Sequence, residues 1–232
     1  RTVERPGLVG QVVDLDQTSV VVEFNDLPAL EAALAKGNVA AVLAEPVMTN
    51  CCMVLPDEGY HDGLRALTRK YGTLLIIDET HTISSGLGGY TRTHGLDPDM
   101  FVLGKPVAGG LPASVWGMTE EMAARYADFE ATRPAGFSGI GTTLSANPLQ
   151  FAAMKANLTH VMTAENYAYM EAGAERLTAG FPKQSHGTRR LGTVFASARA
   201  WNSSAIRNSC GTAAKAIKRT SPSWKRQFTR RW

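Results

Sequence analysis

Three runs of consecutive apolar residues, each ending in a charged residue, most constrain what this chain can fold into. The runs are VAAVLAEPV (39–47), TLLIIDE (73–79) and DMFVLGK (99–105). A strand that is apolar at successive positions is buried on both faces, which is typical of a parallel sheet covered by helices. The predicted fold class is therefore α/β, a mostly parallel sheet with helices on both faces.

Helix signals fill intervals between these runs. Residues 58–72 repeat apolar side chains every three or four positions until Gly72, and Asp26 and Asn147-Pro148 are favoured helix starts. Helices are predicted at 27–37, at 58–72, from Pro148 onward and at 164–180. Further strands are predicted at 18–26, which is rich in β-branched residues, and at 111–119.

The composition indicates a packed globular protein, with 44% apolar and 19% charged residues among 232. No run approaches the ~18 apolar residues of a membrane span, and the first residues lack the apolar core of a signal peptide. Cysteines are three in number, Cys51, Cys52 and Cys210, without metal-ligand spacing, which favours reduced thiols. We therefore expect a soluble, cytoplasmic protein.

Charge divides the chain into two parts. Residues 1–182 carry 12 basic and 21 acidic side chains, a formal charge of −9, whereas residues 183–232 carry 12 basic side chains and no acidic one. A single folded domain seldom divides its charge in this way. The sequence thus predicts a domain at 1–182 and a separate basic tail at 183–232.

Polar groups end three of the predicted strands: Glu45, Asp78 and Lys105. The carboxyl ends of parallel strands meet at one edge of an open α/β sheet, where ligands bind. Each group alone is more often a helix cap or a surface charge. Together they suggest a lysine buried beside a carboxylate, which can exist as a neutral amine and form a Schiff base with a carbonyl.

Four ordered motifs carry a family resemblance: AEPV (44–47), LLIIDE (74–79), LGKPVAGGLP (103–112) and GTTLSANPL (141–149). In order and spacing they resemble the pyridoxal-phosphate domain of class III aminotransferases, most closely the branch containing glutamate-1-semialdehyde aminomutase. The resemblance covers roughly residues 15–180. It implies a fold type I large domain of the pyridoxal-phosphate-dependent transferases, incomplete here because full members are close to twice this length.

The resemblance also implies roles for single residues. Lys105 would hold the aldehyde of pyridoxal 5'-phosphate and later move a proton, and Asp78 would pair with the pyridine nitrogen. Thr143 matches a threonine that binds the cofactor phosphate across a homodimer interface. Partners would be a small-molecule amino donor and a keto acceptor, with no membrane and no nucleic acid.

Other positions differ from the usual family pattern. Asn50 matches an asparagine of the aminomutase-like branch near the phenolic oxygen of the cofactor. Thr80 stands where the family usually stacks a valine or isoleucine on the ring, and His81 where glutamine or methionine is common. Glu45 belongs to the family's Glu-Pro turn, where its role varies. These departures leave substrate choice open between an aminotransferase, our first expectation, and an aminomutase.

Two alternative site types are weaker. Asp78, His81 and His94 could be metal ligands, but Asp-x-x-His with a distant histidine is common by chance, so no metal is expected. The stretch GLGGYTRT (86–93) is glycine-rich, yet it lacks the lysine-serine ending of a phosphate loop. It is predicted to be a flexible loop.

The tail has two interpretations. Clustered Lys and Arg with interspersed Trp would suit a nucleic-acid-binding arm, whereas the abrupt loss of family pattern after residue 182 favours translation in a shifted reading frame. Its composition predicts disorder. A further alternative is that the chain is a non-catalytic remnant.

Overall fold

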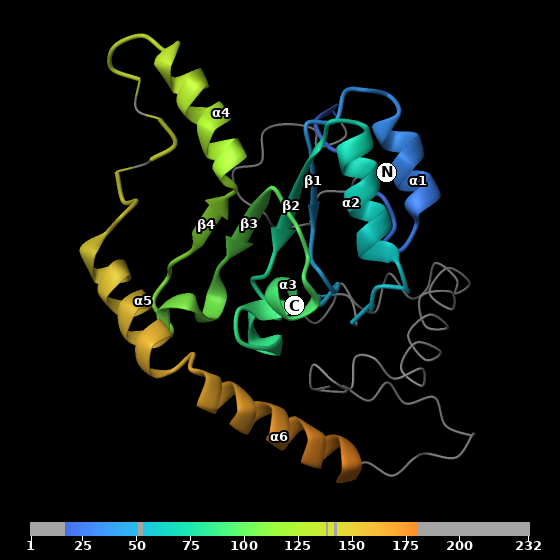
Figure 1. The fold of residues 1–232 in the computed structure, drawn as a ribbon. Helices are drawn as coiled ribbons and strands as arrows, with labels where there is room; N and C mark the ends of the chain where they lie inside the picture. The colour runs from blue at the N-terminus through green and yellow to red at the C-terminus, as the bar shows by residue number, and fades with distance from the viewer. Residues whose placement is uncertain (1–16, 51–52, 138, 142, 181–232) are drawn as a thin grey trace, which may run out of the picture.

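Four strands form one sheet in the order β1 (Ala41–Ala44), β2 (Leu74–Asp78), β3 (Met100–Leu103), β4 (Val115–Met118) in a computed structural model of the chain (Figure 1). The structure describes residues 17–50, 53–137, 139–141 and 143–180. β1 and β2 are parallel, as are β2 and β3, whereas β4 is antiparallel to β3. The mostly parallel α/β sheet predicted from the apolar runs is confirmed.

Eight helical segments accompany the sheet in the described part of the chain. They are α1 (Leu27–Leu34), α2 (Tyr60–Lys70), the 3-10 turn η2 (Thr82–Ser85), α3 (Gly89–His94), the 3-10 turn η3 (Lys105–Ala108), α4 (Glu120–Ala131), α5 (Pro148–His160) and α6 (Ala164–Gly180). The predicted caps are present, since Asp26 accepts a hydrogen bond from Ala29 N (2.9 Å) and Asn147 accepts one from Leu149 N (2.9 Å). Asp26 and Asn147 thus each cap the helix that follows them.

The first hydrophobic core lies between the sheet and helices α1 and α2. Its buried members are Leu30, Leu34, Tyr60, Leu64, Leu75 and Ile77. Leu75 and Ile77 alternate along β2 with the half-buried Leu74 and Ile76, so one face of the strand is covered and the other is less so.

The second face of the sheet is more open than the sequence predicts. Leu43 is 66% exposed and Trp116 is 47% exposed, and Ile76 and Val102, which pair with Met100 and Asp78 in β2–β3, are only half-buried. These side chains are therefore less covered than the continuous apolar runs predict.

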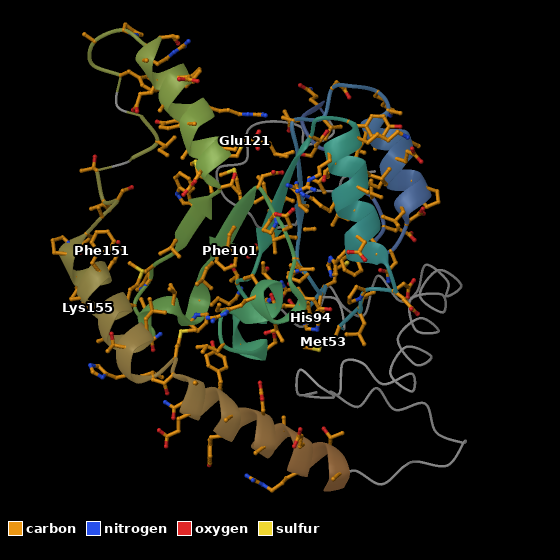
Figure 2. All side chains as sticks on the ribbon, viewed as in Figure 1. Met53, His94, Phe101, Glu121, Phe151 and Lys155 are labelled. Atoms are coloured by element: carbon orange, nitrogen blue, oxygen red, sulfur yellow. The ribbon has the colours of Figure 1, made fainter. Side chains whose placement is uncertain are left out.

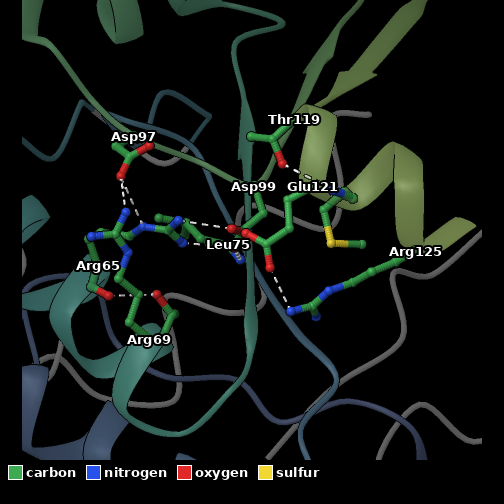
Figure 3. A network of polar contacts seen from close by, with 10 residues as sticks. Arg65, Arg69, Leu75, Asp97, Asp99, Thr119, Glu121 and Arg125 are labelled. Carbon is green, nitrogen blue, oxygen red and sulfur yellow. Dashed lines mark hydrogen bonds and ion pairs between the residues drawn. The ribbon is translucent and has the colours of Figure 1, made fainter.

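An ion pair ties the covering helix to the strands (Figure 3). Arg65 on α2 donates from Nη1 to Asp99 Oδ2 (2.7 Å) and from Nη2 to Asp99 Oδ1 (2.8 Å), and Asp99 Oδ2 also accepts from Leu75 N (2.7 Å). Such a two-point arginine–carboxylate pair fixes orientation as well as distance. The residue before β3 thus holds both α2 and the start of β2.

A second core lies where α5 packs on η3. Its buried members are Ile83, Leu103, Val107, Ala108 and Met154. The other side of α5 lies at the surface of the described chain, where Phe151 is 53% exposed and Lys155 is also exposed (Figure 2). α5 therefore turns one face to the end of β3 and the other face away from it.

Three local expectations differ from the structure. Residues 18–26 form no strand, and Val20 (62% exposed) and Val21 (68% exposed) have no described strand to pair with. Residues 86–93, expected as a loop, contribute most of α3. Helix α4 was not expected; it buries none of its residues, although Met122, Tyr126 and Phe129 are spaced as on one helical face.

The basic tail at 183–232 lies outside the described residues, as do Cys51, Cys52 and Cys210. The domain boundary at residue 182 stays a prediction. Within the described part of the chain, no helix is long and apolar enough to cross a membrane.

Candidate active site

Asp78 is the last residue of β2, and its carboxylate is held by the chain that follows. Oδ1 accepts a hydrogen bond from Thr80 N (2.8 Å), which is the bond of an Asx turn. Among the residues described, Oδ2 has no hydrogen-bond donor. Asp78 thus presents a fixed, half-buried carboxylate with one oxygen available to a ligand.

Lys105 begins η3, two residues after β3 ends, and its side chain is exposed. The expectation of a buried lysine is therefore wrong for the described structure. Val107 and Ala108, the next apolar residues, are buried in the second core at 1% and 4% exposure, so the turn directs them inward and Lys105 outward.

The backbone of Lys105 is left-handed, with φ of 44°. For a residue with a Cβ this conformation costs roughly 1–2 kcal/mol, and it persists only where surrounding contacts impose it. Strain of this kind is concentrated at functional sites. The strained residue is the one that the sequence singles out as the candidate amine.

Asp78 and Lys105 lie at the same edge because their strands are parallel neighbours. Asp78 is opposite Val102, so Lys105 comes three residues beyond the pair. Thr80 lies between the two strand ends, since a Cβ at Gly104 would be 3.5 Å from Thr80 Cγ2. No ion pair between described residues joins Asp78 to Lys105, so each charge is available to a third group.

Glu45, Thr49 and His81 form a polar cluster just beyond the ends of β1 and β2. Thr49 Oγ1 donates to Glu45 Oε2 (2.5 Å) and also contacts His81 Nδ1, and His81 Nδ1 lies 3.5 Å from Glu45 Oε2. Thr49 has one hydroxyl hydrogen; when Glu45 takes it, His81 must donate from Nδ1.

The remaining predicted residues are not brought to this edge by described contacts. Asn50 and Thr143 are both exposed, and neither has a hydrogen bond to another described residue. The segment with Thr143 runs between α4 and α5, on the far side of β4 from β2 (Figure 1). A role for Thr143 across a dimer stays a prediction.

Sequence reasoning missed Glu79, whose carboxylate is fully buried at 0% exposure. It accepts hydrogen bonds from Thr82 Oγ1 (2.5 Å), Tyr90 N (3.2 Å) and Thr91 N (2.5 Å). It thereby fixes the segment between β2 and β3 directly behind Asp78. A signal was present, because an acidic residue closing an apolar strand must find donors if it is buried.

Tyr167 on α6 fixes the same segment from outside. Its hydroxyl donates to Ile83 O (2.8 Å), and the side chain is 4% exposed. Burial, and to a lesser degree the charge of Glu79, raises the pKa of Tyr167. The tyrosine therefore stays a neutral donor to η2 at ordinary pH.

The alternative of a metal site at Asp78, His81 and His94 is not supported by the contacts of His94. His94 on α3 stacks on Tyr90 with ring centroids 3.7 Å apart, and its Nδ1 contacts Tyr90 O (3.2 Å). The described residues contain no group of three or more His, Cys, Asp or Glu side chains placed to hold a metal ion.

Comparisons of the sequence and of the fold with known proteins agree on one family. The sequence model of the family described as Aminotransferase class-III matches residues 9–197, beyond the boundary expected at 182. A glutamate-1-semialdehyde 2,1-aminomutase of Acidobacterium capsulatum is 35% identical over 204 residues, which cover 82% of this chain and 46% of that protein. The chain thus spans about half the length of the curated relatives that it matches.

Solved structures show the same similarity. A glutamate-1-semialdehyde-aminomutase from Pseudomonas aeruginosa PAO1 is 53% identical with a TM-score of 0.71, covering 78% of this chain and 41% of that chain. A β-phenylalanine aminotransferase from Variovorax paradoxus is 28% identical with a TM-score of 0.59, covering 69% of this chain and 36% of that chain.

Proposed function

The chain belongs to the class-III aminotransferase family, and we propose that the whole protein is an enzyme that moves amino groups between small molecules with pyridoxal phosphate. One observation carries the proposal. A carboxylate, Asp78, and an exposed amine, Lys105, end neighbouring parallel strands without pairing to each other. That edge is where ligands of α/β sheets bind.

The residues fit this cofactor. When bound, pyridoxal phosphate supplies a carbonyl for an amine and a ring that accepts electrons. Lys105 would hold it covalently through Nζ, and Asp78 Oδ2, which has no described donor, would accept a hydrogen bond from the protonated ring nitrogen. Asp78 would keep that proton in place because its carboxylate is fixed by Thr80 N.

Further residues are proposed around the ring. Thr80, between the two strand ends, would contact a ring face, and His81 would lie near the ring substituents. Asn50 would lie near the phenolic oxygen. Thr143 would bind the phosphate of the cofactor held by the second subunit of a homodimer, which fits its exposure and the place of its segment on the far side of β4 from β2 (Figure 1).

The reaction is proposed as transfer from an amino donor to a keto acceptor in the cytoplasm. A second candidate is movement of the amino group within one molecule. It is favoured by the curated relatives named above, which are aminomutases, and by a second Pseudomonas aeruginosa structure, a variant in complex with PMP at 52% identity. Thr80 and His81, unlike the usual residues at these positions, favour the first candidate.

The test uses the whole protein with pyridoxal phosphate. Lys105→Ala should abolish the covalent attachment of the cofactor after borohydride reduction. Lys36→Ala, at an exposed lysine on another part of the domain, should leave the attachment unchanged. Asp78→Asn should keep cofactor binding but lose about 10²-fold or more of turnover. Fixation at a single lysine other than Lys105 would show the assignment to be wrong.

Substrate assays decide between the two reactions. Amines and keto acids are assayed as pairs, and glutamate-1-semialdehyde is assayed alone. Turnover of donor and acceptor pairs is expected. Exclusive turnover of the semialdehyde, with no second keto substrate, would replace the first candidate by the aminomutase.

A further inference from the structure

We infer that Asn157 is a positioning residue for Lys105: its side-chain amide holds the turn that presents the lysine at the sheet edge. The inference rests on the proposed role of Lys105 as the cofactor-binding amine. Asn157 lies on α5, about fifty positions further along the chain, and does not itself reach the strand ends.

The contact is between the amide and the backbone of the turn. Asn157 Nδ2 donates to Pro106 O (2.7 Å) and to Val107 O (3.1 Å), the carbonyls of the two residues after Lys105. Asn157 is 8% exposed, so neither bond is exchanged readily for water. The amide carries two N–H groups, enough for both bonds, whereas a carboxylate or an aliphatic side chain has none to donate.

The turn is bracketed by two left-handed residues. Lys105 has φ of 44° and Gly109 has φ of 62°, and Gly109 N donates to Pro106 O (3.0 Å). Asn157 fills the space beside Gly109, since a Cβ there would lie 3.3 Å from Asn157 Oδ1. The strained lysine backbone is therefore held by bonds to the carbonyls that follow it.

Packing and positioning are separable at this junction. Met154, one turn earlier on α5, packs with Val107 and Ala108 in the second core. Asn157→Leu removes the two polar bonds but keeps a side chain of similar volume next to this apolar contact. The variant is therefore expected to keep α5 docked while the turn loses its fixed conformation.

The test compares wild type, Asn157→Leu and Asn157→Gln, which keeps the amide on a longer side chain. The matched control is Asn166→Leu, because Asn166 Nδ2 also donates to a backbone carbonyl, that of Val161 (2.8 Å), but does not touch η3. If thermal unfolding shows that Asn157→Leu is not folded, Asn157→Ser takes its place, because the shorter serine cannot reach both carbonyls.

Two measurements are made on each variant. Amide hydrogen exchange at Gly109, whose N–H donates to Pro106 O, should accelerate about tenfold or more in Asn157→Leu, because the turn opens more often once the bonds from Asn157 are lost. After incubation with pyridoxal phosphate and borohydride, the ratio of labelling at Lys105 to labelling at Lys36 should fall at least about fivefold. Asn157→Gln should recover part of this ratio, and Asn166→Leu should match wild type.

The outcomes separate the inference from the proposed function. If the wild type is labelled preferentially at Lys105, and Asn157→Leu keeps both this preference and the exchange rate at Gly109, the positioning role is wrong. The proposed function is then unaffected. Wild type with no preference for Lys105 over Lys36 overturns the proposed function, and the positioning role with it.

Discussion

Replacing Glu79 by alanine tests whether its buried carboxylate organises the segment behind the candidate site. The substitution removes the acceptor of three hydrogen bonds, from the Thr82 hydroxyl and from the amides of Tyr90 and Thr91. Glu79 is fully buried, so water does not reach these donors unless the segment between β2 and β3 opens.

The magnitude follows from the donors left behind. A buried donor without an acceptor costs about 1–3 kcal/mol, and the longest bond, from Tyr90 N at 3.2 Å, belongs at the low end. Alanine also removes the cost of burying the carboxylate of Glu79, which offsets part of the summed loss of stability from the three donors. We expect Glu79→Ala to lower the free energy of unfolding by about 3–5 kcal/mol, a large fraction of the roughly 5–15 kcal/mol of a typical domain.

Urea unfolding followed by circular dichroism measures this change. The control is Glu121→Ala on α4, where an exposed glutamate pairs with Arg125 (2.6 Å) one turn away, and the expected loss is about 0.5 kcal/mol or less. Glu79→Gln, which keeps one acceptor oxygen, should fall between the two. A loss for Glu79→Ala no larger than that of the control would refute the argument.

Two further predictions concern the same framework. Gly89→Ala should destabilise the fold at least about 1 kcal/mol more than Gly59→Ala: both glycines have φ of 76°, but a Cβ at Gly89 would lie 2.7 Å from Glu79 Oε2 and one at Gly59 meets nothing within 4 Å. Equal losses in thermal unfolding would contradict this. The hydrogen bonds from Arg65 hold the pKa of Asp99 in the folded protein below its ordinary value of 3.8. The stabilisation of the fold by ionised Asp99 is therefore fully present above pH 3.8 and is lost as the pH falls through the lower pKa of the folded state. The stability difference between wild type and Asp99→Asn should therefore narrow below about pH 4 in urea unfolding, and a constant difference would show that the pair does not titrate with folding.

The sheet could be predicted from the sequence because its strands carry their own signal. Continuous apolar runs gave β1, β2 and β3, and the expected placement of Asp78 and Lys105 at one edge followed from parallel pairing. The prediction of a strand at residues 18–26, which rested on β-branched composition, was wrong. β-branched residues favour a strand only where a neighbour is available to pair, and the described chain offers none there.

The finer features of the site depend on contacts that spacing does not encode. Exposure of Lys105 results from Val107 and Ala108 turning inward onto α5. Asn157 meets the turn across about fifty residues, and Glu79 meets α3 across about a dozen. In the sequence, such side chains look like an ordinary helix residue and an ordinary strand end, because only the tertiary fold supplies their partners.

Two of the three hydrophobic cores are built from consecutive parts of the chain, and the third joins those parts, because Val47 and Leu55 pack there with Tyr90. The first uses residues between 22 and 77, and the second uses residues between 83 and 162. Segments organised in this way can open as separate cooperative units. Asp78 directly follows the segment of the first core, and Lys105 lies two residues before Val107 of the second. A molecule that binds both residues would therefore add one more link between segments that the β2–β3 pairing and the third core already join. Its binding free energy would then oppose the local opening of either segment.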